Sequence, residues 1–211
     1  MKILDLYCKA GGATRGYQLA GFEVVGVDLE PQKNHVGELF VQADALSLFD
    51  VIDLSQFVAI HASPPCQAYS ALAAMHPKRR YPKLIEPTRE RLEATGLPFV
   101  IENVERAPLR NPVTLCGSMF GLGAKGGYLR RHRLFETNFP LPQPECAHEG
   151  KGRAVGVYGH GGHSGKHRML AKDDAAAAME IDWMNRDELA QAIPPAYSRY
   201  VGEHLRRHLG L

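Results

Sequence analysis

The sequence predicts an α/β fold, doubly wound around a mostly parallel sheet. Short apolar runs of strand length cover residues 3–8, 22–29, 57–62 and 97–102, and helix-like stretches separate them. Strands that alternate with helices along the chain are typical of a parallel sheet with helices on both faces. A second observation agrees with this interpretation, because polar side chains stand where the runs end, at the sheet edge where open α/β folds bind ligands.

Each element follows from its local sequence. The run 3–8 leads through Gly11-Gly12 into a helix that begins near Thr14, and the next strand ends in Asp28. Further strands are expected at 57–62, 97–102 and 133–137, with a helix at 87–94. Four consecutive alanines favour a helix at 173–179, and two prolines begin a final helix over 194–209.

The stretch 138–170 differs from the rest because it is rich in Pro, Gly and His. We expect long loops there with at most one hairpin, since long irregular segments in compact domains usually serve a function or are disordered. The predicted organisation is therefore a main domain over 1–137, a small irregular insertion over 138–170, and a helical segment over 171–211 that completes the main domain.

Composition limits the class of protein. A chain of 211 residues suits one domain, and its net charge of +2 does not by itself indicate a nucleic-acid binder. Basic residues nevertheless cluster at 78–80, 130–133 and 206–207. We see no long apolar run and no export signal, so we expect a cytoplasmic protein without a membrane partner. The four cysteines show no CxxC pairing and are expected to be reduced thiols.

The first two strand ends predict a cofactor site. Gly11 and Gly12 precede a helix, and glycines there allow a ligand close to the backbone while the helix N-terminus favours an anionic group. Asp28 stands where an acid commonly accepts hydrogen bonds from ribose hydroxyls, and Asp44 is a candidate partner for an adenine amino group. These residues indicate an adenosine-bearing cofactor; a glycine-rich turn beside a surface acid is the alternative.

Cys66 is the candidate nucleophile. It follows Pro64-Pro65 directly after a buried-looking strand, and the prolines hold the turn rigid. A thiol at such a strand end faces the predicted ligand crevice and becomes a good nucleophile when nearby positive charge favours the thiolate. A buried apolar cysteine is the alternative interpretation.

Glu102 ends another apolar run, where loss of solvent would raise its pKa and let it act as a proton donor. Arg131 and Arg133 alternate near a predicted strand, which would place both on one face. They are candidates to hold a phosphate or a base carbonyl, or to orient Glu102. The alternatives are a solvated acid and an exposed edge strand.

Taken in order, these segments resemble the motifs of the cytosine-5 DNA methyltransferase family. The match to the nucleophile loop Ser63-Pro64-Pro65-Cys66-Gln67 and to Glu102-Asn103-Val104 is specific. Weaker similarities add the first cofactor motif at 5–12, the arginine motif at 129–133 and a last motif at 191–195. The motifs keep family order over most of the chain.

The resemblance implies a Rossmann-like S-adenosylmethionine-dependent methyltransferase fold, a flipped-out cytosine and covalent catalysis by Cys66. It implies double-stranded DNA as partner, S-adenosyl-L-methionine as cofactor, and we expect a monomer. The implied catalytic residues are Cys66, Glu102, Arg131 and Arg133. The implied cofactor residues are Asp5, Tyr7, Lys9, Ala10, Gly11, Gly12, Asp28, Leu29, Asp44, Ala45, Pro65 and Gln191. The expected nucleic-acid contacts are Gln67, Ser70, Lys151, Arg153, Lys166 and Arg168.

The sequence departs from the family at several places. Lys9 stands where a glycine is usual, Leu129 replaces a glutamine, and Ala190-Gln191 replace Gly-Asn. The region available for target recognition is short, which predicts a short recognition sequence. Small viral members of the family look like this, so a phage or prophage source, in genome protection or restriction-modification, is the expectation.

Four alternatives stay open. In the first, the chain is a catalytically inactive relative that only binds DNA or a partner. In the second, it is an enzyme that acts on RNA or a free nucleotide, and in the third, it is an enzyme that transfers a modified methyl-like group. A zinc-binding module is the fourth, with Cys146, His148 and histidines at 160, 163 and 167 as ligands. That spacing fits no standard finger, so we expect no metal and interpret the histidines as free residues of a DNA-facing loop.

Overall fold

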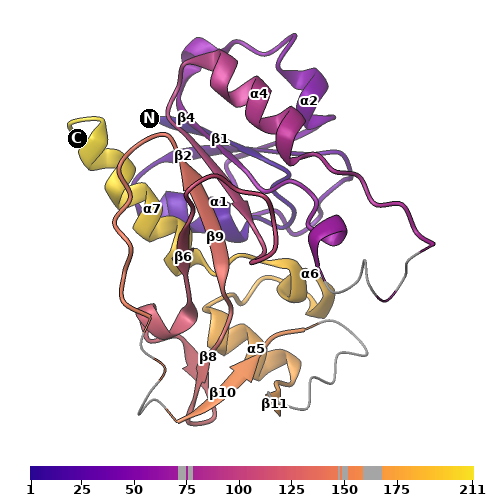
Figure 1. The fold of residues 1–211 in the computed structure, drawn as a ribbon, viewed down its shortest axis with the longest axis vertical. Helices are drawn as coiled ribbons and strands as arrows, with labels where there is room; N and C mark the ends of the chain where they lie inside the picture. Colours follow the sequence, from indigo (N-terminus) through magenta and orange to yellow (C-terminus); the bar gives the residue numbers. More distant parts are fainter. Residues whose placement is uncertain (71–74, 76–77, 147, 149–151, 159–167) are drawn as a thin grey trace.

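The computed structural model describes all residues except 71–74, 76–77, 147, 149–151 and 159–167 (Figure 1). A seven-stranded sheet runs through its centre in the order β3-β2-β1-β4-β5-β9-β6. β9 pairs antiparallel with β5 and β6, and the other neighbours are parallel. The strands are β1 Lys2–Leu6, β2 Glu23–Asp28, β3 Leu39–Gln42, β4 Phe57–Ala62, β5 Phe99–Asn103, β6 Val113–Leu115 and β9 Arg133–Thr137.

Helices cover both faces of the sheet, which confirms the predicted doubly wound arrangement (Figure 1). α1 (Gly12–Leu19) and α7 (Pro195–His208) pack against each other on one face, and α2 (Ala45–Leu48) and α4 (Ile85–Thr95) lie on the other. Gly16 permits the close approach of α1 and α7, because a Cβ there would lie 2.2 Å from the Pro195 carbonyl oxygen.

The side chains of each strand divide between two apolar cores. Ile3 of β1 packs on the α1 and α7 side, and its neighbour Leu4 packs on the α2 and α4 side. This alternation follows from the period of two along a strand and makes both faces of the sheet apolar. Among the described residues, no helix is long and apolar enough to span a membrane.

A second, four-stranded sheet lies beside the main one, in the order β11-β10-β8-β7. Its strands are β7 Gly123–Ala124, β8 Gly127–Leu129, β10 Arg153–Gly156 and β11 Arg168–Met169. The stretch 138–170, expected to consist of long loops with at most one hairpin, contributes the two short strands β10 and β11, which pair in parallel. β7 and β8 come from before residue 138. Val155 and Leu170 share one apolar core with Ile3, so the small sheet is continuous with the main domain.

The remaining elements are short. α5 (Lys172–Met179) packs on the small sheet, and α6 (Arg186–Gln191) leads into α7. Three 3-10 turns complete the description: η1 Leu54–Gln56, η2 Gln67–Tyr69 and η3 Gly117–Phe120.

A buried ion pair joins α4 to β9. Arg89 on α4 is 1% exposed and donates from Nε and Nη2 to the two carboxylate oxygens of Glu136, at 2.7 and 2.8 Å. Glu136 also accepts from the backbone amide of Arg110. Each charge is paired and hydrogen-bonded, which is the condition under which such a pair is tolerated away from water.

We predict that Arg89→Met lowers the free energy of unfolding by about 3–5 kcal/mol, because the buried Glu136 carboxylate loses its partner. Arg91→Met, on the same helix, is the matched control: Arg91 pairs with Asp50 at a half-exposed site, so its loss should cost less than about 1 kcal/mol. Urea denaturation of both variants measures the difference. Equal losses would contradict the assignment.

Candidate active site at the strand ends

Four neighbouring parallel strands end at one level of the sheet. Leu6 of β1 pairs with Val27 of β2 and with Ala62 of β4, and Ala62 pairs with Ile101 of β5. The residues that follow this row are Tyr7, Asp28, Ser63 and Glu102. The register therefore brings together the predicted cofactor loop, the ribose-binding acid, the nucleophile loop and the proton donor.

The loop after β1 contains two residues in the left-handed region, Tyr7 at φ 60° and Lys9 at φ 48°. Non-glycine residues adopt this conformation at a cost and only where their surroundings impose it. The Lys9 amide donates to Asp28 Oδ2 at 3.1 Å, its ammonium lies 3.5 Å from Asp28 Oδ1, and His35 Nδ1 contacts its carbonyl at 3.0 Å. These contacts account for a lysine in a position that suits glycine.

Gly11 and Gly12 have a packing role that the sequence did not indicate. Gly11 adopts φ 85°, and a Cβ on Gly12 would lie 2.4 Å from the Ile193 carbonyl oxygen. The glycines therefore allow the segment before α7 to close over the loop. Trp183 contributes to the same closure by donating from Nε1 to the Ala10 carbonyl at 2.9 Å.

Cys66 lies half-buried at the start of η2. The Asn103 side chain at the end of β5 donates to the Pro64 carbonyl at 2.8 Å and so holds the nucleophile loop against the neighbouring strand. Burial raises the pKa of the Cys66 thiol and the charge of Glu102 raises it further, whereas Arg133 lowers it in part.

Glu102 is buried and Arg133 Nε lies 3.3 Å from its Oε1. Burial raises the pKa of Glu102, against the opposing effects of Arg133 and of a hydrogen bond from Ser63. A carboxyl group in this environment holds a proton more readily than one in water. A thiol, a carboxyl group of raised pKa and a cation thus lie together.

A chain of buried hydrogen bonds behind Glu102 was missed in the sequence. Tyr17 OH bonds His61 Nδ1 at 2.9 Å, and His61 Nε2 bonds Ser63 Oγ at 2.9 Å. Burial lowers the pKa of His61 to about 3, so the ring is neutral and carries one proton. The tautomer with Nε2–H lets Ser63 donate to Glu102. A histidine inside an apolar strand was the only available signal.

Arg131 differs from its prediction. It lies before β9, not on it, and its side chain is buried. Its guanidinium donates to the carbonyls of Ala190, Ala192 and Val157 at 2.8–3.1 Å. In this structure Arg131 therefore ties the segment before α7 to the end of β10. Its charge also lowers the pKa of Cys66 and of Glu102, as the charge of Arg133 does, so both arginines lie near these two residues.

The other predicted cofactor residues surround the loop. Asp5 is buried and accepts from Thr14 Oγ1, and its Oδ1 has no hydrogen-bond partner among the described residues. Burial raises the pKa of Asp5 to about 7. Leu29 is an exposed apolar side chain beside Asp28. Asp44 caps α2 through Oδ1, next to Ala45. Gln191 ends α6 and bonds the Asp187 carbonyl.

An orphaned buried carboxylate oxygen at Asp5, an exposed apolar surface at Leu29 and an acid at Asp28 fit a ligand that carries a positive charge, an aromatic base and a ribose. S-adenosyl-L-methionine is such a ligand. Asp5, Asp28 and Leu29 therefore fit the cofactor that the motifs implied.

The predicted nucleic-acid contacts are only partly described. Gln67 begins η2, and its buried Oε1 has no hydrogen-bond partner in the part of the chain that the structure describes. Ser70 donates to the Gln67 carbonyl. Arg153 begins β10 as an exposed residue, and Arg168 lies on the neighbouring β11. The predicted contacts Lys151 and Lys166 lie outside the described residues.

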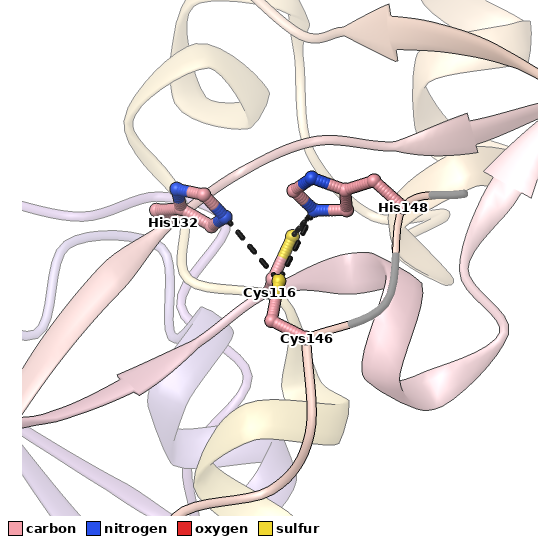
Figure 2. Close-up of side chains that lie close together, drawn as sticks. All are labelled: Cys116, His132, Cys146 and His148. Carbon is pink, nitrogen blue, oxygen red and sulfur yellow. Dashed lines mark hydrogen bonds between the residues drawn. The ribbon is translucent and has the colours of Figure 1, made fainter.

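The residues considered as zinc ligands in the fourth alternative, where we expected no metal, separate into two groups. His160, His163 and His167 lie outside the described residues. Cys146 and His148 lie instead beside Cys116 and His132, two residues that the sequence did not suggest as partners (Figure 2).

We predict that alkylation of Cys66 keeps accelerating as the pH is raised past 9, because the thiolate is the reactive form and burial raises the pKa of this thiol. Arg133→Gln should slow alkylation at pH 8, since the nearby cation that favours the thiolate is removed. Arg130→Gln, at an exposed neighbour, is the control. Iodoacetamide labelling with peptide mapping measures the rate at Cys66; equal rates in both variants would refute the coupling.

The sequence matches no family model and no curated relative, whereas solved structures match over the full length. S. pombe Dnmt2 methyltransferase superposes with a TM-score of 0.66 at 14% identity, over 100% of this chain and 99% of that one. An E. coli prophage-encoded protein assigned as a DNA modification methyltransferase gives 0.63 at 13% identity, over 100% of both chains. The Entamoeba histolytica methyltransferase EhMeth gives 0.60 at 11% identity, over 99% and 98%. The chain therefore has the methyltransferase fold of these proteins along its whole length, as the motif resemblance implied.

Proposed function

We propose that the protein is an S-adenosyl-L-methionine-dependent cytosine-5 methyltransferase that acts on double-stranded DNA. The observation that supports this most strongly is the placement of Cys66, Glu102 and Arg133 at adjoining strand ends of a methyltransferase fold. A thiol nucleophile beside a carboxyl group of raised pKa suits addition to a pyrimidine ring, which needs attack at C6 and a proton at N3.

The proposed cofactor contacts follow the strand ends. Asp28 accepts the ribose hydroxyls and Leu29 packs on the adenine. Asp44 accepts from the amides of Leu46 and Ser47 and from the Ser47 hydroxyl through Oδ1, so the adenine amino group is assigned to Oδ2. Asp5 and the closed loop at Ala10 hold the methionine end. When bound, S-adenosyl-L-methionine supplies an electrophilic methyl group.

The residues of the chain carry the other steps. The Cys66 thiolate forms a bond to C6 of a flipped cytosine while Glu102 gives its proton to N3, which makes C5 nucleophilic. After C5 takes the methyl group, the C5 proton passes to solvent, the bond between Cys66 and C6 breaks, and the N3 proton returns to Glu102. Arg133 holds Glu102 and steadies the base.

Duplex DNA is proposed over RNA because one structural neighbour is assigned to DNA modification. Arg153 and Arg168 of the small sheet suit the phosphates of either nucleic acid. Gln67, Ser70, Arg153 and Arg168 are the proposed contacts among the described residues. We further propose a short recognition sequence, a monomer, and a role in phage genome protection or restriction-modification. Action on RNA is the alternative that the same chemistry allows.

We predict that Cys66→Ser lowers methyl transfer by on the order of 10⁴-fold or more, because it removes the nucleophile that adds to C6. Glu102→Gln should lower it roughly 10²- to 10⁴-fold, because it removes the group that gives a proton to N3. Both variants should still bind S-adenosyl-L-methionine in calorimetry. Transfer of labelled methyl groups to duplex DNA, single-stranded DNA and transfer RNA measures activity. Full activity of Cys66→Ser would sink the mechanism, and transfer to RNA alone would replace the substrate.

We predict that Asp28→Asn weakens binding of S-adenosyl-L-methionine roughly 10- to 100-fold, the loss expected for hydrogen bonds to a charged acceptor. Asp50→Asn changes an exposed acid that pairs with Arg91 and should leave the affinity unchanged. Calorimetric titration of both variants tests the assignment, which fails if the two dissociation constants agree.

A further inference from the structure

Four potential metal ligands converge beside the small sheet. The ligand atoms of Cys116, His132, Cys146 and His148 all lie within 4.8 Å of one another (Figure 2). Cys146 Sγ lies 3.5 Å from His132 Nε2 and 3.1 Å from His148 Nε2, and Cys116 Sγ lies 3.4 Å from His148 Nε2. Two sulfurs and two ring nitrogens therefore face one small volume.

These separations agree with tetrahedral zinc. Zinc binds cysteine sulfur at about 2.3 Å and histidine nitrogen at about 2.0–2.1 Å, so neighbouring ligand atoms of a tetrahedral site lie about 3.3–3.8 Å apart. The sulfur–nitrogen distances of 3.4 and 3.5 Å fall inside that range, and the distance of 3.1 Å is 0.2 Å below it. Without an ion, each sulfur would interact with the imidazole rings of His132 and His148 through weak hydrogen bonds alone.

The surroundings orient both rings. His132 Nδ1 bonds Glu105 Oε1 at 2.8 Å, which keeps a proton on Nδ1 and turns the Nε2 lone pair toward the two sulfurs. Histidines that bind metal are usually held by a carboxylate or carbonyl in this way. The His148 ring stacks on Tyr128 at 5.2 Å between centroids, with the planes 20° apart.

Three separate segments supply the ligands. Cys116 follows β6, His132 lies between β8 and β9, and Cys146 and His148 lie on the connection after β9. This spacing matches no regular zinc finger, which explains why the sequence pointed to the histidines of the later loop.

We propose that Cys116, His132, Cys146 and His148 bind a structural Zn²⁺ ion. Two cysteines and two histidines favour zinc over the hard cations magnesium and calcium. Four protein ligands complete a tetrahedral shell and leave no open position, which is typical of a structural site. The assignment does not depend on the proposed methyl transfer.

A bound ion would hold the small sheet and connect it to the arginine segment of the active site. Strands of two to four residues form the small sheet, and units of this size often need a metal to hold them. His132 stands between Arg131 and Arg133, so a bound ion fixes the arginine segment of the active site to the connection that leads into β10. Loss of the ion should therefore weaken DNA binding more than it weakens cofactor binding.

Elemental analysis of the full-length protein, purified under reducing conditions from zinc-supplied cells, tests the proposal. We expect one zinc ion per chain, lost in Cys146→Ser and in His148→Gln. Cys66→Ser and His204→Gln are the matched controls and should retain zinc. Zinc in Cys66→Ser without methyl transfer would separate this site from the catalytic one.

Cobalt provides a second test that needs no variant. Chelator-treated wild-type protein given Co²⁺ should show the intense visible bands of tetrahedral cobalt with thiolate ligands, and added Zn²⁺ should remove them while raising the melting temperature. The proposal is wrong if zinc-supplied protein holds no stoichiometric zinc and Co²⁺ gives no such bands. A disulfide between Cys116 and Cys146 in metal-free, freshly purified protein would also overturn it.

Discussion

The shared register of β2, β1, β4 and β5 places the ends of these four strands at one level and so determines where the candidate site lies. Leu6, Ala62 and Ile101 pair in one row across the sheet, so the residues that follow them lie close together at the same sheet edge. Strand pairing alone is enough to produce this arrangement. A slip of one residue in β4 would turn the side chains of that strand to the opposite face and carry Cys66 away from Glu102. Packing on both sheet faces opposes such a slip, because Ile60 would leave its core on the α2 and α4 side and the buried His61 would turn away from its partner Tyr17 on α1.

That register also determines the electrostatics of the site. Burial at the strand ends raises the pKa of both Cys66 and Glu102, and two cations, Arg133 and to a smaller extent Arg131, oppose both effects. The neutral chain of Tyr17, His61 and Ser63 adds directional hydrogen bonds without adding charge. The site thus combines a carboxyl group that holds a proton more readily than one in water with a buried thiol whose ionisation the two arginines favour.

Most of the main sheet could be predicted because its strands are apolar on both faces and end in recognisable residues. Cys66 and Glu102 followed from that pattern, and Gly11-Gly12 from the turn chemistry. β3 was missed because its residues are mostly exposed, and the small sheet was missed because strands of two residues leave no periodicity. The partners of Arg131 and the grouping of Cys116 with His148 depend on tertiary contacts between segments that no local pattern connects.

The central claim is that the Cys66 sulfur bonds to C6 of a cytosine, and trapping of that adduct tests it most directly. Duplex DNA with 5-fluorocytosine, incubated with the protein and S-adenosyl-L-methionine, retains the adduct because fluorine at C5 cannot leave as a proton does. The account predicts a stable protein–DNA complex whose digestion yields the Cys66 peptide bonded to the modified base, and no complex with Cys66→Ser. Adduct formation at another residue, or an equally stable complex with Cys66→Ser, would contradict it.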